Sequence, residues 1–119
     1  MSDTFLDSLQ QFGSTAISLD KLAKVLGMSS KHFAEAAGVH QSTLRWHPES
    51  ERAQTFARNV IRVLQAATDL DGDPEHALFL LKNLPIRSFS YMTALELIEG
   101  GRANDVVGYL ESLSAGYVG

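Results

Sequence analysis

Residues 30–47 read SKHFAEAAGVHQSTLRWH, with the spacing of two short helices around a glycine turn. Ala34 lies four residues before Gly38, and Leu44 lies six residues after it. A small side chain at Ala34 lets the two helices approach closely, and Gly38 accepts the positive φ that a tight turn requires. Val39 and Leu44 then fill the angle between the helices. This spacing predicts a helix-turn-helix unit.

In a helix-turn-helix protein the second helix enters the major groove of DNA, and its first residues read the base edges. We expect Gln41 and Arg45 to do this, because Gln can pair with adenine and Arg with guanine through two hydrogen bonds. Residues at the start of the first helix are placed to contact phosphate. The candidate DNA-binding residues are Ser30, Lys31, His40, Gln41, Ser42 and Arg45. The alternative is that the two helices only pack within a bundle. Trp46 is expected in the core rather than stacked on a base.

Apolar residues recur at helical intervals on both sides of this unit, and no alternating β-branched pattern is present. The predicted helices cover about residues 3–12, 19–26, 30–37, 49–69, 74–84, 93–100 and 103–114. A further short helix starts at about Gln41, and Pro48 limits its length. Residues 86–92 form a connector, in which a short strand is an open alternative. We therefore predict an all-α protein. An N-terminal helix-turn-helix bundle (residues 1–70) is joined by a long helix to a small C-terminal helical domain (residues 71–119).

The composition narrows the classes of site. The 119-residue chain has no cysteine, which excludes disulfides and thiolate metal sites, and its four histidines have no recognisable ligand spacing. We expect no metal site and no cofactor. No apolar run is long enough to cross a bilayer, and the N-terminus does not read as a secretory signal, so we expect a cytoplasmic protein with no membrane contact. No nucleophile–base set or phosphate loop is evident, and we expect no enzymatic activity.

The charge is distributed unevenly along the chain. Residues 1–62 carry seven Lys or Arg and six Asp or Glu, whereas residues 63–119 carry three and eight, so the first part has a charge of +1 and the second of −5. This asymmetry indicates that the N-terminal part contacts DNA and that the C-terminal part contacts a protein. A single unit would neutralise few phosphates, so we expect DNA binding by a homodimer that presents two recognition helices.

Four short motifs in the second part carry a family resemblance. They are Gly72-Asp-Pro-Glu75-x-Ala77, Asn83-x-Pro85, Thr93-x-Leu95-Glu96-Leu97, and Gly101-Arg102-Ala103 leading into residues 106–113. In this order and spacing they resemble the toxin-binding domain of the Xre-type antitoxins of RES–Xre toxin–antitoxin modules. With the preceding helix-turn-helix, the resemblance covers residues 18–119. Two features depart from it: such domains usually have proline after the threonine and a glycine-containing turn before it, whereas this chain has Ala94 and residues 89–92 (FSYM).

The resemblance implies a specific function. In that family the antitoxin C-terminus docks onto a RES-domain toxin, which consumes NAD⁺, and obstructs its active site. The complex represses its own operon through the Xre-like domain. Carried over to this chain, the toxin-binding residues would be Arg102, Tyr109, Leu113, Ser114, Gly116 and Tyr117. The expected partners are a RES-domain toxin, in a hetero-oligomer, and operator DNA. The alternative is a stand-alone helix-turn-helix transcription regulator with a C-terminal dimerisation domain.

Overall fold

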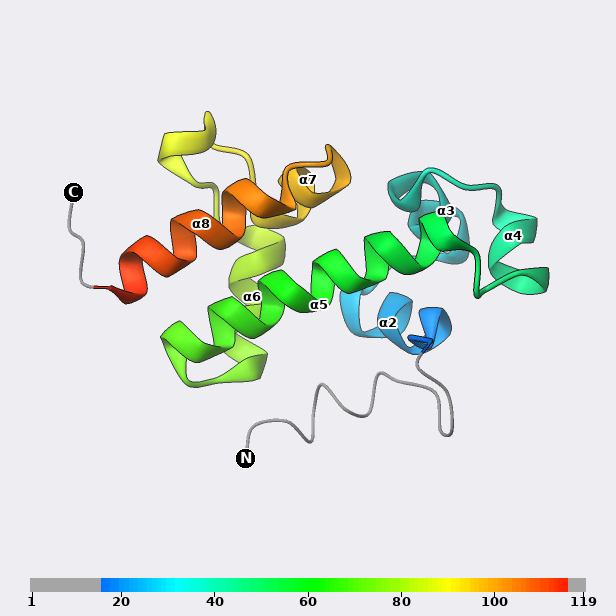
Figure 1. Ribbon diagram of the computed structural model, residues 1–119, viewed down its shortest axis with the longest axis horizontal. Coiled ribbons are helices and arrows are strands. Elements are labelled where there is room, and N and C mark those ends of the chain that lie inside the picture. The colour runs from blue at the N-terminus through cyan, green and yellow to red at the C-terminus, as the bar shows by residue number, and fades with distance from the viewer. Residues whose placement is uncertain (1–15, 116–119) are drawn as a thin grey trace. The chain divides into compact units, whose positions relative to one another are not determined.

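A computed structural model describes residues 16–115 (Figure 1). This part of the chain is helical and contains no β-strand, which confirms the all-α prediction for residues 16–115. The α-helices are α2 (Leu19–Leu26), α3 (Ser30–Ala37), α4 (Gln41–Trp46), α5 (Glu51–Asp71), α6 (Pro74–Asn83), α7 (Ala94–Glu99) and α8 (Ala103–Ser114), and the 3-10 turn is η1 (Arg87–Phe89). The helix expected at 3–12, and Gly116 and Tyr117, lie outside the described residues. Within residues 16–115 no helix has the length and apolar character to cross a membrane.

The chain divides within α5 into two structural units, residues 1–58 and 59–119. The division follows the contacts between residues and does not test the domains expected at 1–70 and 71–119, which stay a prediction.

The first unit contains α2, α3, α4 and the start of α5. Ser18 and Ser29 cap α2 and α3, each hydroxyl accepting a hydrogen bond from the backbone N–H three residues later. Gly38 ends α3 with φ +75°, and its carbonyl oxygen accepts a hydrogen bond from Arg52 Nη1 at 3.4 Å. Phe33 and Phe56 meet edge to face in the core, with ring centroids 5.3 Å apart. The other buried apolar residues are Ile17, Leu19, Leu22, Leu26, Met28, Ala34, Ala37, Ala53 and Ala57.

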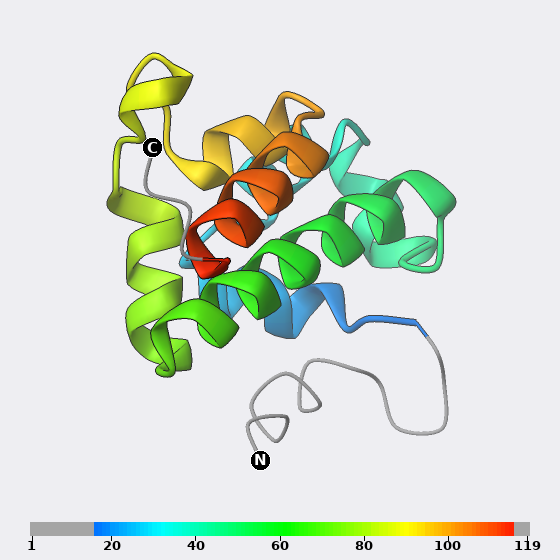
Figure 2. The ribbon, with the colours of Figure 1, turned by 60° about the vertical axis from the view of Figure 1, so that its left-hand side comes forward.

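The second unit contains the rest of α5 with α6, α7 and α8. In both views α8 lies beside the second half of α5 (Figures 1 and 2). Asp73 caps α6 and Pro74 occupies its first turn, as expected where a missing N–H costs nothing. Thr93 and Glu96 form a capping box at the start of α7. The buried apolar residues are Val60, Val63, Leu64, Ala77, Leu81, Ile86, Ala94, Leu97, Ile98, Ala103 and Val106.

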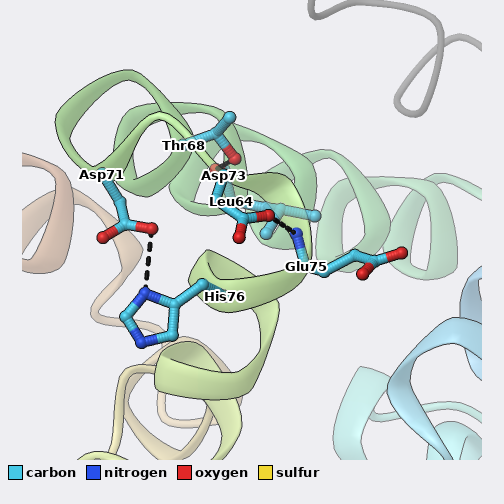
Figure 3. Close-up of polar contacts among 6 residues, drawn as sticks. All are labelled: Leu64, Thr68, Asp71, Asp73, Glu75 and His76. Carbon is cyan, nitrogen blue, oxygen red and sulfur yellow. Dashed lines mark hydrogen bonds and ion pairs between the residues drawn. The ribbon is translucent and has the colours of Figure 1, made fainter.

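The corner between α5 and α6 is closed by polar contacts (Figure 3). The buried Thr68 hydroxyl donates to the Leu64 carbonyl at 2.7 Å, one turn earlier in α5. Asp71 Oδ2 lies 2.9 Å from His76 Nδ1, which joins the end of α5 to the first turns of α6. Asp73 Oδ1 accepts a hydrogen bond from the Glu75 N–H at 3.1 Å. Of these contacts, the one between Asp71 and His76 connects the two helices directly.

The connector at residues 86–92 contains a 3-10 turn in place of the short strand considered above. Its ends meet in one isolated bridge between Ile86 and Met92. The tip carries two non-glycine residues with positive φ, Ser90 at +56° and Tyr91 at +63°. A strand would need an extended backbone, and the bonds from the N–H groups of Phe89 and Tyr91 to the Ile86 carbonyl curl the chain instead.

Candidate functional site

The first unit has a hollow at α4 with both polar and apolar lining residues, termed the polar hollow for its five polar or charged side chains. It brings together four of the six candidate DNA-binding residues, Ser30, Gln41, Ser42 and Arg45. All four are exposed. Gln41 and Arg45 lie one helical turn apart on α4, so their side chains share a face. The hollow therefore presents amide, hydroxyl and guanidinium groups together.

The two other candidates, Lys31 and His40, are the chain neighbours of Ser30 and Gln41 but do not line the hollow. Lys31 is exposed in the first turn of α3. His40 is the N-cap residue of α4, is exposed, and makes no side-chain cap hydrogen bond. A cation at Lys31 and an imidazole at His40 are thus open to solvent at the two helix starts.

Trp46 corrects one expectation, because it is 67 % exposed rather than part of the core. It lies four residues after Ser42 and lines the same hollow. The guanidinium carbon of Arg45 lies 5.1 Å from the centroid of the Trp46 ring, which restrains the arginine by a cation–π contact. Helical periodicity could have predicted this exposure. Trp46 lies one turn after the exposed Ser42 and two residues after the half-buried Leu44, so it shares the face of Ser42 and not that of Leu44.

The hollow also contains a carboxylate that the sequence did not single out. Asp20, in the first turn of α2, lines it together with Leu19 and Ala23. Asp20 Oδ2 lies 3.5 Å from Lys24 Nζ, and both side chains are about four-fifths exposed. An exposed pair of this kind contributes little to stability. Asp20 places a carboxylate in the same lining as the Arg45 guanidinium.

The second unit has an apolar hollow along α8, with a volume of about 250 Å³. It includes two of the candidate toxin-binding residues, Tyr109 and Leu113. Leu113 is 40 % exposed and Tyr109 is half-buried. Asp71 is the one charged residue in its lining. The other lining residues are Val63, Ala67, Leu70, Leu80, Leu81, Leu84, Ile86, Ala94, Val106 and Leu110.

Phe89 joins two further candidate residues, and the sequence did not single it out. Its ring meets that of Tyr109 edge to face at 5.8 Å, and the guanidinium carbon of Arg102 lies 5.2 Å from its centroid. Arg102 Nε also donates to Asp105 Oδ2 at 2.9 Å. The connector is therefore held against α8 at both Arg102 and Tyr109. No local periodicity signals this contact, because Phe89 lies 20 residues before Tyr109.

The remaining candidates lie at the end of the chain. Ser114 is exposed in the last turn of α8, while Gly116 and Tyr117 lie outside the described residues. Among residues 16–115 no group of three His, Asp or Glu side chains is placed to hold a metal ion.

Comparisons of the chain with protein-family models, with curated proteins and with solved structures find no match. The functional interpretation therefore rests on the sequence motifs and on the two hollows.

Proposed function

We propose that this chain is an antitoxin of the RES–Xre type, which binds a RES-domain toxin with its second unit and operator DNA with its first. The observation that carries the proposal is the presence of two surfaces of different chemistry, one in each unit. One is a polar hollow with Gln41 and Arg45, and the other is an apolar hollow with Tyr109 and Leu113.

The polar hollow has the chemistry of a base-reading surface. The turn at Gly38 joins α3 to α4, and the groups on the outer face of α4 are those that pair with adenine and guanine in the major groove. The unit has equal numbers of basic and acidic residues, six of each, so the total charge attracts DNA little. Tight binding then requires two copies on two half-sites, and we propose that the chain represses its own operon as a dimer.

The apolar hollow has the chemistry of a protein interface. Contiguous exposed apolar patches mark interfaces on folded proteins, and Leu70, Leu84 and Leu113 are exposed in this lining. Residues 59–119 carry four basic and eight acidic residues, which disfavours nucleic acid as the partner. The last helix and the tail beyond it are the segments that the family resemblance assigns to blocking the toxin's NAD⁺ site.

The direct test is co-expression with the product of the neighbouring gene, which the proposal expects to be a RES-domain protein, followed by a pull-down and an assay of NAD⁺ consumption. We expect a stable complex in which NAD⁺ consumption is suppressed at least about tenfold relative to the toxin alone. Deletion of residues 114–119 should restore the toxin's activity, because the blocking segment is gone. The control variant Lys31→Ala, in the first unit, should inhibit like the unchanged chain.

A failure to bind or to inhibit any such protein would overturn the antitoxin proposal. The alternative, a stand-alone regulator, places a second copy of this chain over the apolar hollow. Light scattering on the Leu113→Asp variant distinguishes the two functions. If the chain is a stand-alone regulator, the substitution should convert a dimer to a monomer. If the chain is an antitoxin, the substitution should abolish the complex with the toxin.

A further inference from the structure

The tip of the connector between α6 and α7 holds a tyrosine in an unfavourable backbone conformation. Ser90 and Tyr91 have φ values of +56° and +63°, and the Met92 N–H donates to the Phe89 carbonyl at 3.0 Å. Two successive positive φ values closed by this bond form a type I′ turn, which favours Asn and Gly at its centre. A tyrosine there is strained, because its Cβ lies close to the backbone.

The turn is held in place from both sides. The Ile86 N–H donates to the Met92 carbonyl, and the Tyr91 N–H donates to the Ile86 carbonyl, each at 2.9 Å. Ile86 is buried, and the Phe89 ring packs against Tyr109 and Arg102. The tip therefore has a defined conformation, which the rest of the unit stabilises against the strain.

Burial of the tyrosine does not explain the strain. Tyr91 is 64 % exposed, so most of its ring gains nothing from packing within the fold. Glycine at this position would relieve the strain and fold at least as well. A strained residue that does not stabilise the fold indicates selection for function, such as binding, rather than for stability. An exposed aromatic side chain on a backbone of defined conformation suits an interface anchor, because little backbone freedom is lost when it binds.

We infer that Tyr91 is a preorganised contact residue for a protein partner, separate from the end of α8. A protein suits the unit better than nucleic acid or an anionic membrane, because residues 59–119 carry twice as many acidic as basic residues. This inference rests on the proposed function, in which the partner is the toxin. It adds a second point of contact, on the connector, to the one expected at the tail.

The test compares Tyr91→Gly with Ser90→Gly in the full chain. Both variants relieve a positive-φ strain of the same kind, so both should raise the Tm by about 2–6 °C. Only Tyr91→Gly removes the aromatic contact. We therefore expect its Kd for the toxin, measured by calorimetry, to rise about tenfold or more, while Ser90→Gly binds like the unchanged chain.

The outcomes distinguish this inference from the proposed function. If the unchanged chain binds the toxin and Tyr91→Gly binds equally well, the Tyr91 contact is wrong and the antitoxin proposal stands. A Tyr91→Gly variant that is less stable than the unchanged chain would also overturn the inference, because Tyr91 would then serve the fold. If the unchanged chain binds no toxin, the proposed function fails first, and the inference fails with it.

Discussion

Gln54 connects three segments of the first unit through the hydrogen bonds of its side-chain amide. Its side chain is 5 % exposed. Nε2 donates to the carbonyls of Ile17 and Pro48 at 3.0 and 2.8 Å, and Oε1 accepts from the Ile17 N–H at 2.8 Å. One amide thus joins the start of α5 both to the segment before α2 and to the loop after α4. Its partner Ile17 is 37 residues away, which is why no local pattern reveals it.

Replacement of this amide should destabilise the unit strongly. We expect Gln54→Leu to lower the free energy of unfolding by about 2–4 kcal/mol, because it leaves the buried polar groups of Ile17 without their partner. Urea denaturation measures this as a shift of the midpoint at constant slope. The neighbouring exposed Thr55→Ala is the control and should change stability by less than about 0.5 kcal/mol. Equal effects of the two variants would contradict the role assigned to Gln54.

Local chemistry made other single residues predictable. The caps at Ser18, Ser29, Asp73 and Thr93 are side chains that satisfy free N–H groups within three residues, so the local sequence is enough to place them. Contacts across the chain were not predictable in this way. The contacts of Phe89 and the positive φ of Tyr91 depend on the backbone path of the connector. Short-range sequence rules do not specify that path.

Among the elements, α4 shows how a short helix divides its side chains. Leu44 is half-buried, while Gln41 and Arg45 are exposed, although all three line the same hollow. The helix ends at Trp46, two residues before Pro48. The expectation that Trp46 is buried was wrong because it used the residue's hydrophobicity and not its place on the helix. Position on so short a helix decides which side chains remain in solvent.

The proposed role of α4 predicts an effect of Trp46 on DNA binding. In Trp46→Ala the cation–π contact that restrains Arg45 is lost, so the Kd for operator DNA should rise about 2- to 5-fold. Stability should change little, since the ring is exposed. Phe79→Ala, an equally accessible aromatic on α6, is the matched control. A gel shift that gives the same affinity for both variants would show that Trp46 takes no part.

The helices themselves were largely predictable, and the connector was not. The bounds of α8, 103–114, and those of α2 and α3 agree with the expectation, because caps and glycines mark their ends. In residues 86–92 a 3-10 turn and two positive φ values replace the strand considered there. Neither serine nor tyrosine favours such a conformation, so their sequence carried no signal for it.

At the scale of the whole molecule, the unequal charge distribution and the two hollows lead to one expectation. The chain should have two activities that single substitutions can remove separately. The six candidate DNA-binding residues lie in the first unit, and the candidate toxin-binding residues lie in the second. We therefore expect that loss of one activity leaves the other unchanged, provided that both variants fold.

Arg45→Ala and Leu113→Asp test this separation in the full chain. Arg45→Ala removes a guanidinium group suited to guanine, so operator affinity should fall about tenfold or more while inhibition of the toxin persists. Leu113→Asp places a charge in the apolar hollow, so toxin affinity should fall by a similar factor while DNA binding in the absence of toxin persists. Because both side chains are accessible, circular dichroism should show the unchanged helix content for each variant. A folded Arg45→Ala variant that also loses inhibition would mean that one surface serves both partners, and the assignment of DNA and toxin to separate units would then be wrong.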